Sequence, residues 1–150
     1  MRVFTVLFAA MALTVSLLAP ANAADISKNE LTSILAGQGY NVRDYDANKV
    51  LVNVSGYNII VALDGADGDV TYITWLQGVS GNDLGYKFLN EFNNEVKFGR
   101  AYIDRDGDVT IQMDRNAAGG VSAENIESDF DVFLMLVSKF LSDLEAQTIA

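Results

Sequence analysis

The stretch from Phe88 to Val121 reads FLNEFNNEVKFGRAYIDRDGDVTIQMDRNAAGGV. The end of an amphipathic helix is followed here by two alternating strands, which we expect at residues 98–104 and 108–114. Arg105-Asp106-Gly107 lies between them. Asp-Gly is a strong hairpin signal, because glycine adopts positive φ without strain and aspartate tolerates it. The stretch therefore predicts a helix and a β-hairpin, which Gly119-Gly120 separates from the next element.

Upstream of this stretch, four runs typical of strands are separated by short turns. They cover Tyr40–Tyr45, Val50–Val54, Tyr57–Leu63 and Val70–Leu76. β-Branched and aromatic residues favour strands, and Ser55-Gly56 and the acid–glycine residues 64–69 supply turn signals. Runs this closely spaced predict an antiparallel meander. The run at 57–63 is apolar on both faces, so we expect it in the middle of the sheet.

Three helices are expected, each with an identifiable start. Ser27 and Glu30 form a capping-box pair that satisfies free backbone donors at the first helix. Ser80 and Asp83 are expected to cap the second helix, and Ser122 to cap the last one. The buried stripe of the second helix comprises Leu84, Phe88, Phe92 and Val96. The stripe of the last helix comprises Ile126, Phe130, Phe133, Val137, Phe140 or Leu141, and Leu144.

The order of elements is therefore helix, three or four strands, helix, two strands, helix. Antiparallel connections of this kind place helices largely on one side of a sheet. The sequence predicts the α+β class, with an antiparallel sheet of about five to six strands and three helices. No linker or repeat interrupts residues 25–147, so we expect one domain from residue 24 to residue 150.

The motifs of the opening stretch resemble those of the YbjN family. They are an Asn-rich helix end near Asn94, the FGRAY strand at 98–102, the D-x-DGD turn at 104–108 and the GGVS helix entry at 119–122. The resemblance extends over most of residues 26–145. It implies a fold similar to type III secretion chaperones and a role described as sensory transduction regulation. It also implies that Asn94 makes a structural bond and that Arg100 belongs to the family motif.

The N-terminus is typical of a signal peptide. Arg2 precedes an apolar run from Val3 to Ala19, and Ala21 and Ala23 form the A-x-A pattern of a cleavage site. We expect residues 1–23 to be removed at the Ala23/Ala24 bond, which leaves a periplasmic or secreted protein without membrane insertion. A transmembrane anchor is the alternative interpretation, and the small residues after the apolar run argue against it.

The charge balance excludes several kinds of partner. The chain has 20 acidic and 10 basic residues and a net charge of −10. A surface this acidic repels phosphate backbones and anionic headgroups, so we expect no nucleic-acid partner. With 0 cysteines, packing must hold the domain together without disulfides.

The sequence contains no constellation typical of an enzyme. It has 0 histidines and 0 cysteines, which removes the commonest general base and the thiol nucleophile. Glu91 and Glu95 stand one helical turn apart, but two such acids are usually a solvated face. We therefore predict a non-enzymatic protein without a cofactor.

The loop that starts at Asp104 raises the alternative of a calcium site. An EF-hand loop needs glycine at its sixth position and glutamate at its twelfth, whereas Gly107 is fourth and Arg115 twelfth counting from Asp104. We therefore expect a turn and no metal site. A periplasmic module that binds a small ligand or a divalent cation remains the alternative function.

The main hypothesis is protein–protein contact, regulatory or chaperone-like, with a protein client or a second copy in a homodimer. The last helix is apolar over an arc wider than one sheet face needs, because Val132, Met135 and Leu136 extend its stripe. These residues are the candidate interface, together with Arg100. For Arg100 a structural role, as a partner of Asp114 or Glu95, is the favoured alternative.

Overall fold

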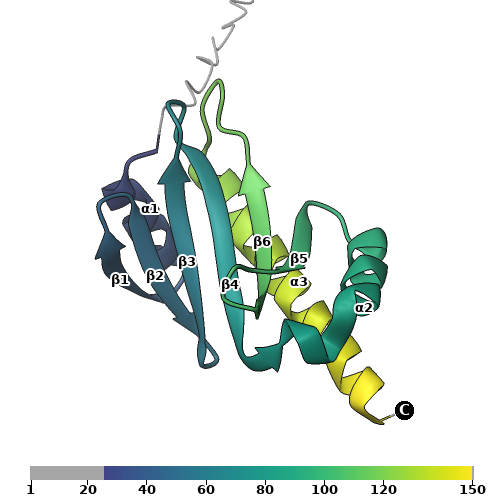
Figure 1. Ribbon diagram of the computed structural model, residues 1–150. Coiled ribbons are helices and arrows are strands. Elements are labelled where there is room, and N and C mark those ends of the chain that lie inside the picture. The colour runs from purple at the N-terminus through teal and green to yellow at the C-terminus, as the bar shows by residue number, and fades with distance from the viewer. Residues whose placement is uncertain (1–25, 150) are drawn as a thin grey trace, which may run out of the picture.

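The computed structural model describes residues 26–149 (Figure 1). The expected signal peptide and its cleavage site lie outside these residues. Three helices accompany a six-stranded antiparallel sheet of order β1-β2-β3-β4-β6-β5. The helices are α1 (Lys28–Gly37), α2 (Gly81–Glu95) and α3 (Ala123–Ile149). The strands are β1 (Asn41–Asp46), β2 (Lys49–Val54), β3 (Tyr57–Asp64), β4 (Asp69–Ser80), β5 (Gly99–Ile103) and β6 (Asp108–Arg115). The predicted α+β class and the element order are confirmed.

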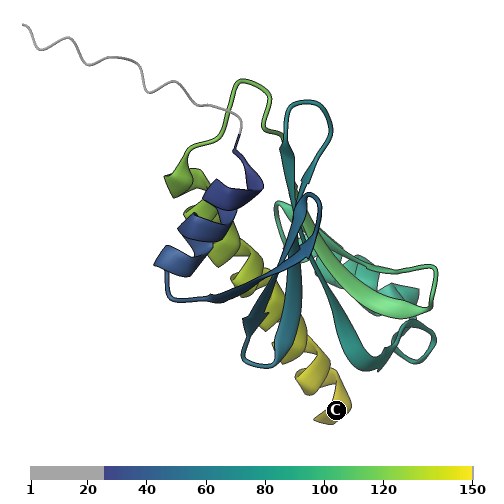
Figure 2. The same ribbon diagram turned by 90° about the vertical axis from the view of Figure 1, so that its left-hand side faces the viewer.

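The helices pack on one face of the sheet. Figure 1 shows α1 and α3 behind the strands, with α2 beside the lower half of α3 at the β5 edge, and Figure 2 shows α1 and α3 to the left of the sheet. The rings of Phe88 and Phe92 on α2 meet Phe140 of α3 edge to face, at centroid distances of 5.3 and 5.0 Å. No helix among residues 26–149 covers the other face, which we call the open face.

The meander follows the turn chemistry of the sequence. Ser55 and Gly56 both have positive φ, 52° and 91°, and connect the opposed residues Val54 and Tyr57. Two positive φ angles define the turn whose twist matches paired strands. The β3 strand lies between β2 and β4, as its two apolar faces predicted. The β4 strand continues to Ser80, beyond the expected end, through an irregular register after Trp75.

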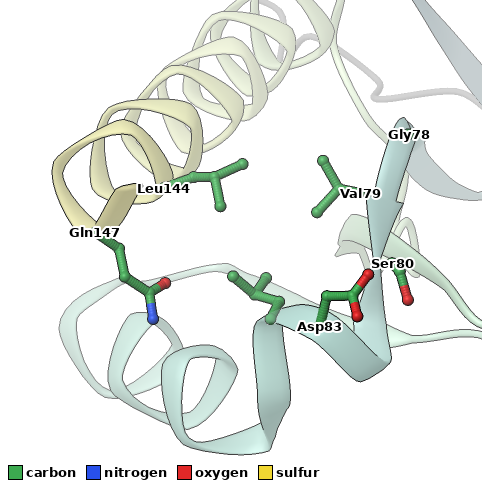
Figure 3. A pocket seen from close by; sticks show the side chains of 7 residues that line it. Gly78, Val79, Ser80, Asp83, Leu144 and Gln147 are labelled. Carbon is green, nitrogen blue, oxygen red and sulfur yellow. The ribbon is translucent and has the colours of Figure 1, made fainter. Parts of the chain in front are cut away.

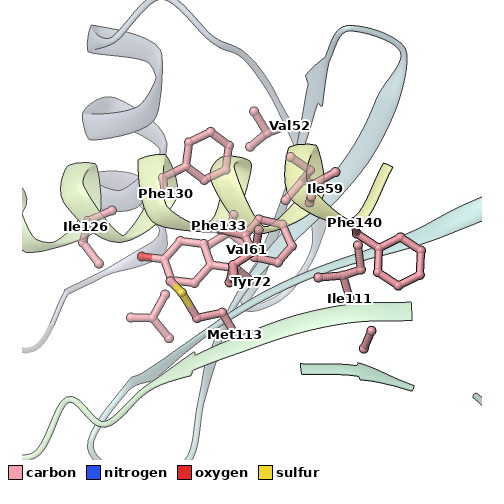
Figure 4. Close-up of a cluster of buried hydrophobic side chains, with 14 of the residues drawn as sticks. Val52, Ile59, Val61, Tyr72, Ile111, Met113, Ile126, Phe130, Phe133 and Phe140 are labelled. Atoms are coloured by element: carbon pink, nitrogen blue, oxygen red, sulfur yellow. The ribbon is translucent and has the colours of Figure 1, made fainter. Parts of the chain in front are cut away.

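The core lies between the sheet and α3. Figure 4 shows aromatic residues of α3 against side chains of β3, β4 and β6. The rings of Tyr72 and Phe133 stack at a centroid distance of 6.0 Å, and Phe130 lies 6.2 Å from Tyr72. The Tyr72 hydroxyl is buried and has no hydrogen-bond partner within the described part of the chain. Its burial raises the pKa of this hydroxyl, so the side chain stays neutral.

The helix starts agree with the sequence in two cases out of three. Ser27 and Glu30 make the expected capping box, and the Ser122 hydroxyl accepts from the Asn125 amide at 3.2 Å. Ser80 occupies the N-cap of α2, but its side chain makes no capping bond. Gly85 then interrupts this helix with φ 81° and ψ 154°. The expected side-chain cap is therefore wrong, and Gly85 separates the first turn from the rest of the helix. The predicted stripe is confirmed, because Phe92 is buried and Leu84, Phe88 and Val96 pack against the core.

A side-chain amide protects the edge strand β5. Asn93 donates to the Ala101 carbonyl at 2.9 Å and accepts from the Ala101 amide at 2.8 Å. This pair of bonds replaces those of a neighbouring strand and limits edge pairing with another chain. The bond that the resemblance implied for Asn94 is made by Asn93.

Candidate functional site

An apolar surface is exposed where α3 passes the start of β5. Phe98 is 78% exposed and Met135 63%, while Val132 is half-buried. Phe98 and Val132 line the same hollow of about 590 Å³. Met135 lies one turn after Val132, so the two side chains occupy neighbouring positions on the helix. We call Phe98, Val132 and Met135 the α3–β5 surface.

Leu136 differs from the other candidate interface residues. It is only 7% exposed and packs against Gly99. A Cβ atom added at Gly99 would lie 2.5 Å from Leu136 Cδ1, so glycine permits this approach between β5 and α3. The expectation that Leu136 is available to a partner is therefore wrong: the residue belongs to the core of its own chain.

Arg100 makes the cross-hairpin pair that its structural alternative predicted. Its Nη1 atom donates to Asp114 Oδ2 at 2.8 Å, and its guanidinium lies 5.9 Å from the centre of the Tyr102 ring. Burial by itself would raise the pKa of Asp114, but hydrogen bonds from Gln112, Thr71 and Arg100 hold it below its ordinary value. The Arg100 side chain is still about half exposed, and its partner Asp114 lines the hollow beside the α3–β5 surface.

A second ion pair lies in this hollow and was missed by the sequence analysis. Arg115 of β6 binds Asp129 of α3 through two hydrogen bonds, of which the one from Nη2 to Oδ1 is 2.7 Å long. The bonds to Asp129 raise the pKa of Arg115 against the opposing effect of burial. Bidentate arginine–carboxylate pairs are geometrically specific. This pair connects β6 to α3, and both residues line the same hollow as Phe98 and Val132.

The acid–glycine hairpin uses its first carboxylate to form the turn. Asp104 Oδ1 accepts from the backbone amides of Asp106 and Asp108, both at 3.0 Å, and Oδ2 accepts from Thr110 at 3.2 Å. The prediction of a hairpin turn at residues 104–108 is therefore confirmed. Within residues 26–149, no group of three or more metal-binding side chains is gathered in one place.

The two glutamates of α2 are each paired with a lysine. Glu91 lies 3.7 Å from Lys87, and Glu95 lies 2.9 Å from Lys139 of α3. Both carboxylates are exposed on the outside of the helix. They form the solvated, charged helix surface that the sequence favoured for these residues.

A further hollow of about 430 Å³ opens between the end of β4, the start of α2 and the end of α3 (Figure 3). Among the described residues of its lining, Asp83 is the only ionisable one. The other lining residues are Gly78, Val79, Ser80, Leu84, Leu144 and Gln147.

These features define a small α+β domain with an exposed apolar surface between α3 and β5. The family model described as "Putative bacterial sensory transduction regulator" matches residues 27–146, and the chain belongs to this YbjN family. No curated protein sequence matches the chain.

Two solved structures share the fold. One is a crystal structure of YbjN from E. coli, titled "a putative transcription regulator", with a TM-score of 0.64 and 12% identity over 80% of this chain and 92% of that chain. The other is the Yersinia pestis type III secretion chaperone SycH in complex with a stable fragment of YscM2. Its TM-score is 0.56 at 14% identity, over 78% of this chain and 98% of that chain. The chaperone-like fold that the resemblance implied is confirmed.

Proposed function

We propose that this protein is an exported regulatory or chaperone-like module of the bacterial cell envelope that acts by binding a protein, without catalysis. The observation that carries the proposal is the α3–β5 surface, where Phe98 and Met135 are 78% and 63% exposed. Large apolar side chains that lie together on a small acidic domain are typical of a surface that a partner covers.

The kind of partner is supported by the comparisons. The family is described as a bacterial sensory transduction regulator, and SycH, which shares the fold, was crystallised with a protein fragment. A protein client is therefore a natural occupant of the α3–β5 surface, and a second copy of the chain is the other. Paired charges at the border, Arg100–Asp114 and Arg115–Asp129, add geometric selectivity to the apolar contact.

The proposal predicts that Met135→Glu abolishes association while the domain stays folded. A carboxylate at this position would lose its hydration when a partner covers it, whereas it stays in water on the free domain. We expect the complex formed by the parent in periplasmic extract, detected by crosslinking and light scattering, to be lost in the variant. Thermal unfolding should be unchanged, since Met135 is 63% exposed.

Tyr45→Glu is the matched control, because Tyr45 is 54% exposed on β1, at the opposite edge of the sheet. It introduces the same charge and should leave association intact. A complex that survives Met135→Glu, or a parent that forms no complex in the extract or on its own, would overturn the proposal.

Export gives an independent prediction. Signal peptidase cleavage after Ala23 would produce a mature protein that begins at Ala24. Mass spectrometry of the periplasmic fraction should therefore find this N-terminus. Recovery of the full-length chain in the membrane fraction would show that residues 1–23 act as an anchor instead.

A further inference from the structure

The open face of the sheet carries an apolar floor that no helix among residues 26–149 covers. The strand register places Leu51, Ile60 and Ile73 opposite one another across β2, β3 and β4. The register of β4, β6 and β5 likewise places Trp75 and Tyr102 on either side of Thr110. Four of these residues are half-buried: Ile60, Ile73, Trp75 and Tyr102. They have apolar area that a second molecule can still cover.

This floor is the bottom of a hollow. The hollow has a volume of about 480 Å³ and is closed at one end by the β5–β6 hairpin, residues 104–108. A smaller hollow of about 160 Å³ continues on the other side of Trp75, towards Gly56 and Tyr57. Trp75 lines both, and we call these two neighbouring hollows of the open face the trough. Figure 2 shows the hairpin on the side of the molecule away from α1 and α3.

The rim is acidic. The Asp104 carboxylate accepts hydrogen bonds within the turn. Asp106 and Asp108 are exposed, and within the described residues neither of these two carboxylates forms a salt bridge. Arg105 is the one cation among the lining residues that the structure describes. The rim therefore has an excess of negative charge, which adds to the net charge of −10 of the whole chain. Cations are attracted to such a rim, and anions are repelled.

We propose that this trough binds a short extended segment of a partner protein in which apolar residues are flanked by lysine or arginine. The apolar residues cover the floor formed by Ile60, Ile73, Trp75 and Tyr102, and a flanking cation pairs with Asp106 and Asp108. An extended segment fits because its alternate side chains point to one side, as the floor requires. The floor lies on the open face, whereas Val132 and Met135 belong to α3, which packs on the opposite face of the sheet.

The single tryptophan of the chain reports directly on this site. We suggest titrating the purified protein with the synthetic peptide KKFLVFKK and, separately, with EEFLVFEE, neither of which contains tryptophan. The lysine peptide should shift the emission of Trp75 to shorter wavelength in a saturable manner, because it displaces water from the indole. The glutamate peptide should produce no shift.

Variants then separate the rim from the floor. Replacing both rim acids, Asp106→Asn with Asp108→Asn, should weaken binding about three- to tenfold, as expected for two solvent-exposed charge pairs. Ile73→Thr keeps a β-branched strand residue but removes apolar floor, and it should weaken binding about fivefold. Met135→Glu should bind the lysine peptide as the parent does, which keeps this test separate from that of the proposed function.

Asp67→Asn is the charge-matched control for the single change Asp106→Asn, since Asp67 is an exposed acid in the β3–β4 turn, outside the trough. It should leave the affinity unchanged. An equal loss in Asp67→Asn and Asp106→Asn would mean attraction by net charge alone and would overturn the site. The absence of any shift in Trp75 emission would also overturn the site. So would an emission shift that appears when the protein concentration is raised without peptide, because it would indicate a second copy in the trough.

Discussion

Replacing Phe140 by alanine is expected to lower the free energy of unfolding by about 3–5 kcal/mol, the largest effect of any single change considered. Phe140 is 0% exposed and receives the rings of Phe88 and Phe92 edge to face. Its removal leaves a cavity where α2 and α3 meet. Urea denaturation followed by circular dichroism measures the change.

Phe98→Ala is the control for this experiment, because the same atoms are removed from a side chain that is 78% exposed. Its effect on stability should be within about 0.5 kcal/mol. Similar losses for both variants would mean that α2 is held by something other than the aromatic contact. A small loss for Phe140→Ala would mean that the cavity collapses.

The second large effect is expected at Gly81, the first residue of α2. An added Cβ would lie 2.4, 2.7 and 2.8 Å from three side-chain atoms of Ile103 on β5. Gly81 is also fixed by its backbone bond of 3.0 Å to the Gly107 carbonyl, so the helix cannot retreat without breaking that bond. Gly81→Ala should therefore cost about 1–3 kcal/mol through overpacking, measured by the same denaturation.

A double-mutant cycle identifies the cause. In an Ile103→Ala background the added methyl group has room, so Gly81→Ala should cost much less, with a coupling of about 1 kcal/mol or more. Gly37→Ala is the control, because nothing lies within 4 Å of a Cβ at that position, and it should be neutral or slightly stabilising. Equal costs of Gly81→Ala in both backgrounds would contradict the proposed clash with Ile103.

The local signals of the sequence predicted the elements well because each depends on a few neighbouring residues. The Ser27–Glu30 capping box, the Ser55-Gly56 turn and the Asp104–Asp108 hairpin all formed as expected. The same local signals did not predict where the backbone departs from helical geometry. The stripe of α2 suggested an unbroken helix from residue 84, but Gly85 adopts a conformation that ends the first turn. Periodicity records which side chains are apolar and not which backbone angles the chain adopts.

In the candidate interface, too, local spacing predicted some features and contacts between distant residues decided others. Helical spacing placed Val132, Met135 and Leu136 outside the main stripe, and Met135 is indeed exposed. The burial of Leu136 depends on Gly99 of β5, which is distant in sequence and allows close approach only because it has no side chain. The Arg115–Asp129 pair has the same origin, since it joins residues of β6 and α3 that meet only when the helix lies across the sheet.

The sequence by itself determined the class, the order of the elements, the acidic charge and the family, because composition, turn residues and apolar periodicity are properties of the chain before it folds. Only the tertiary structure decided which apolar residues stay exposed and which carboxylates face a floor of aromatic and aliphatic side chains. The trough on the open face arises from strand register, which places Ile60 opposite Ile73 and Trp75 opposite Thr110. Register is set by the packing of all strands together, so no single stretch of the sequence specifies it.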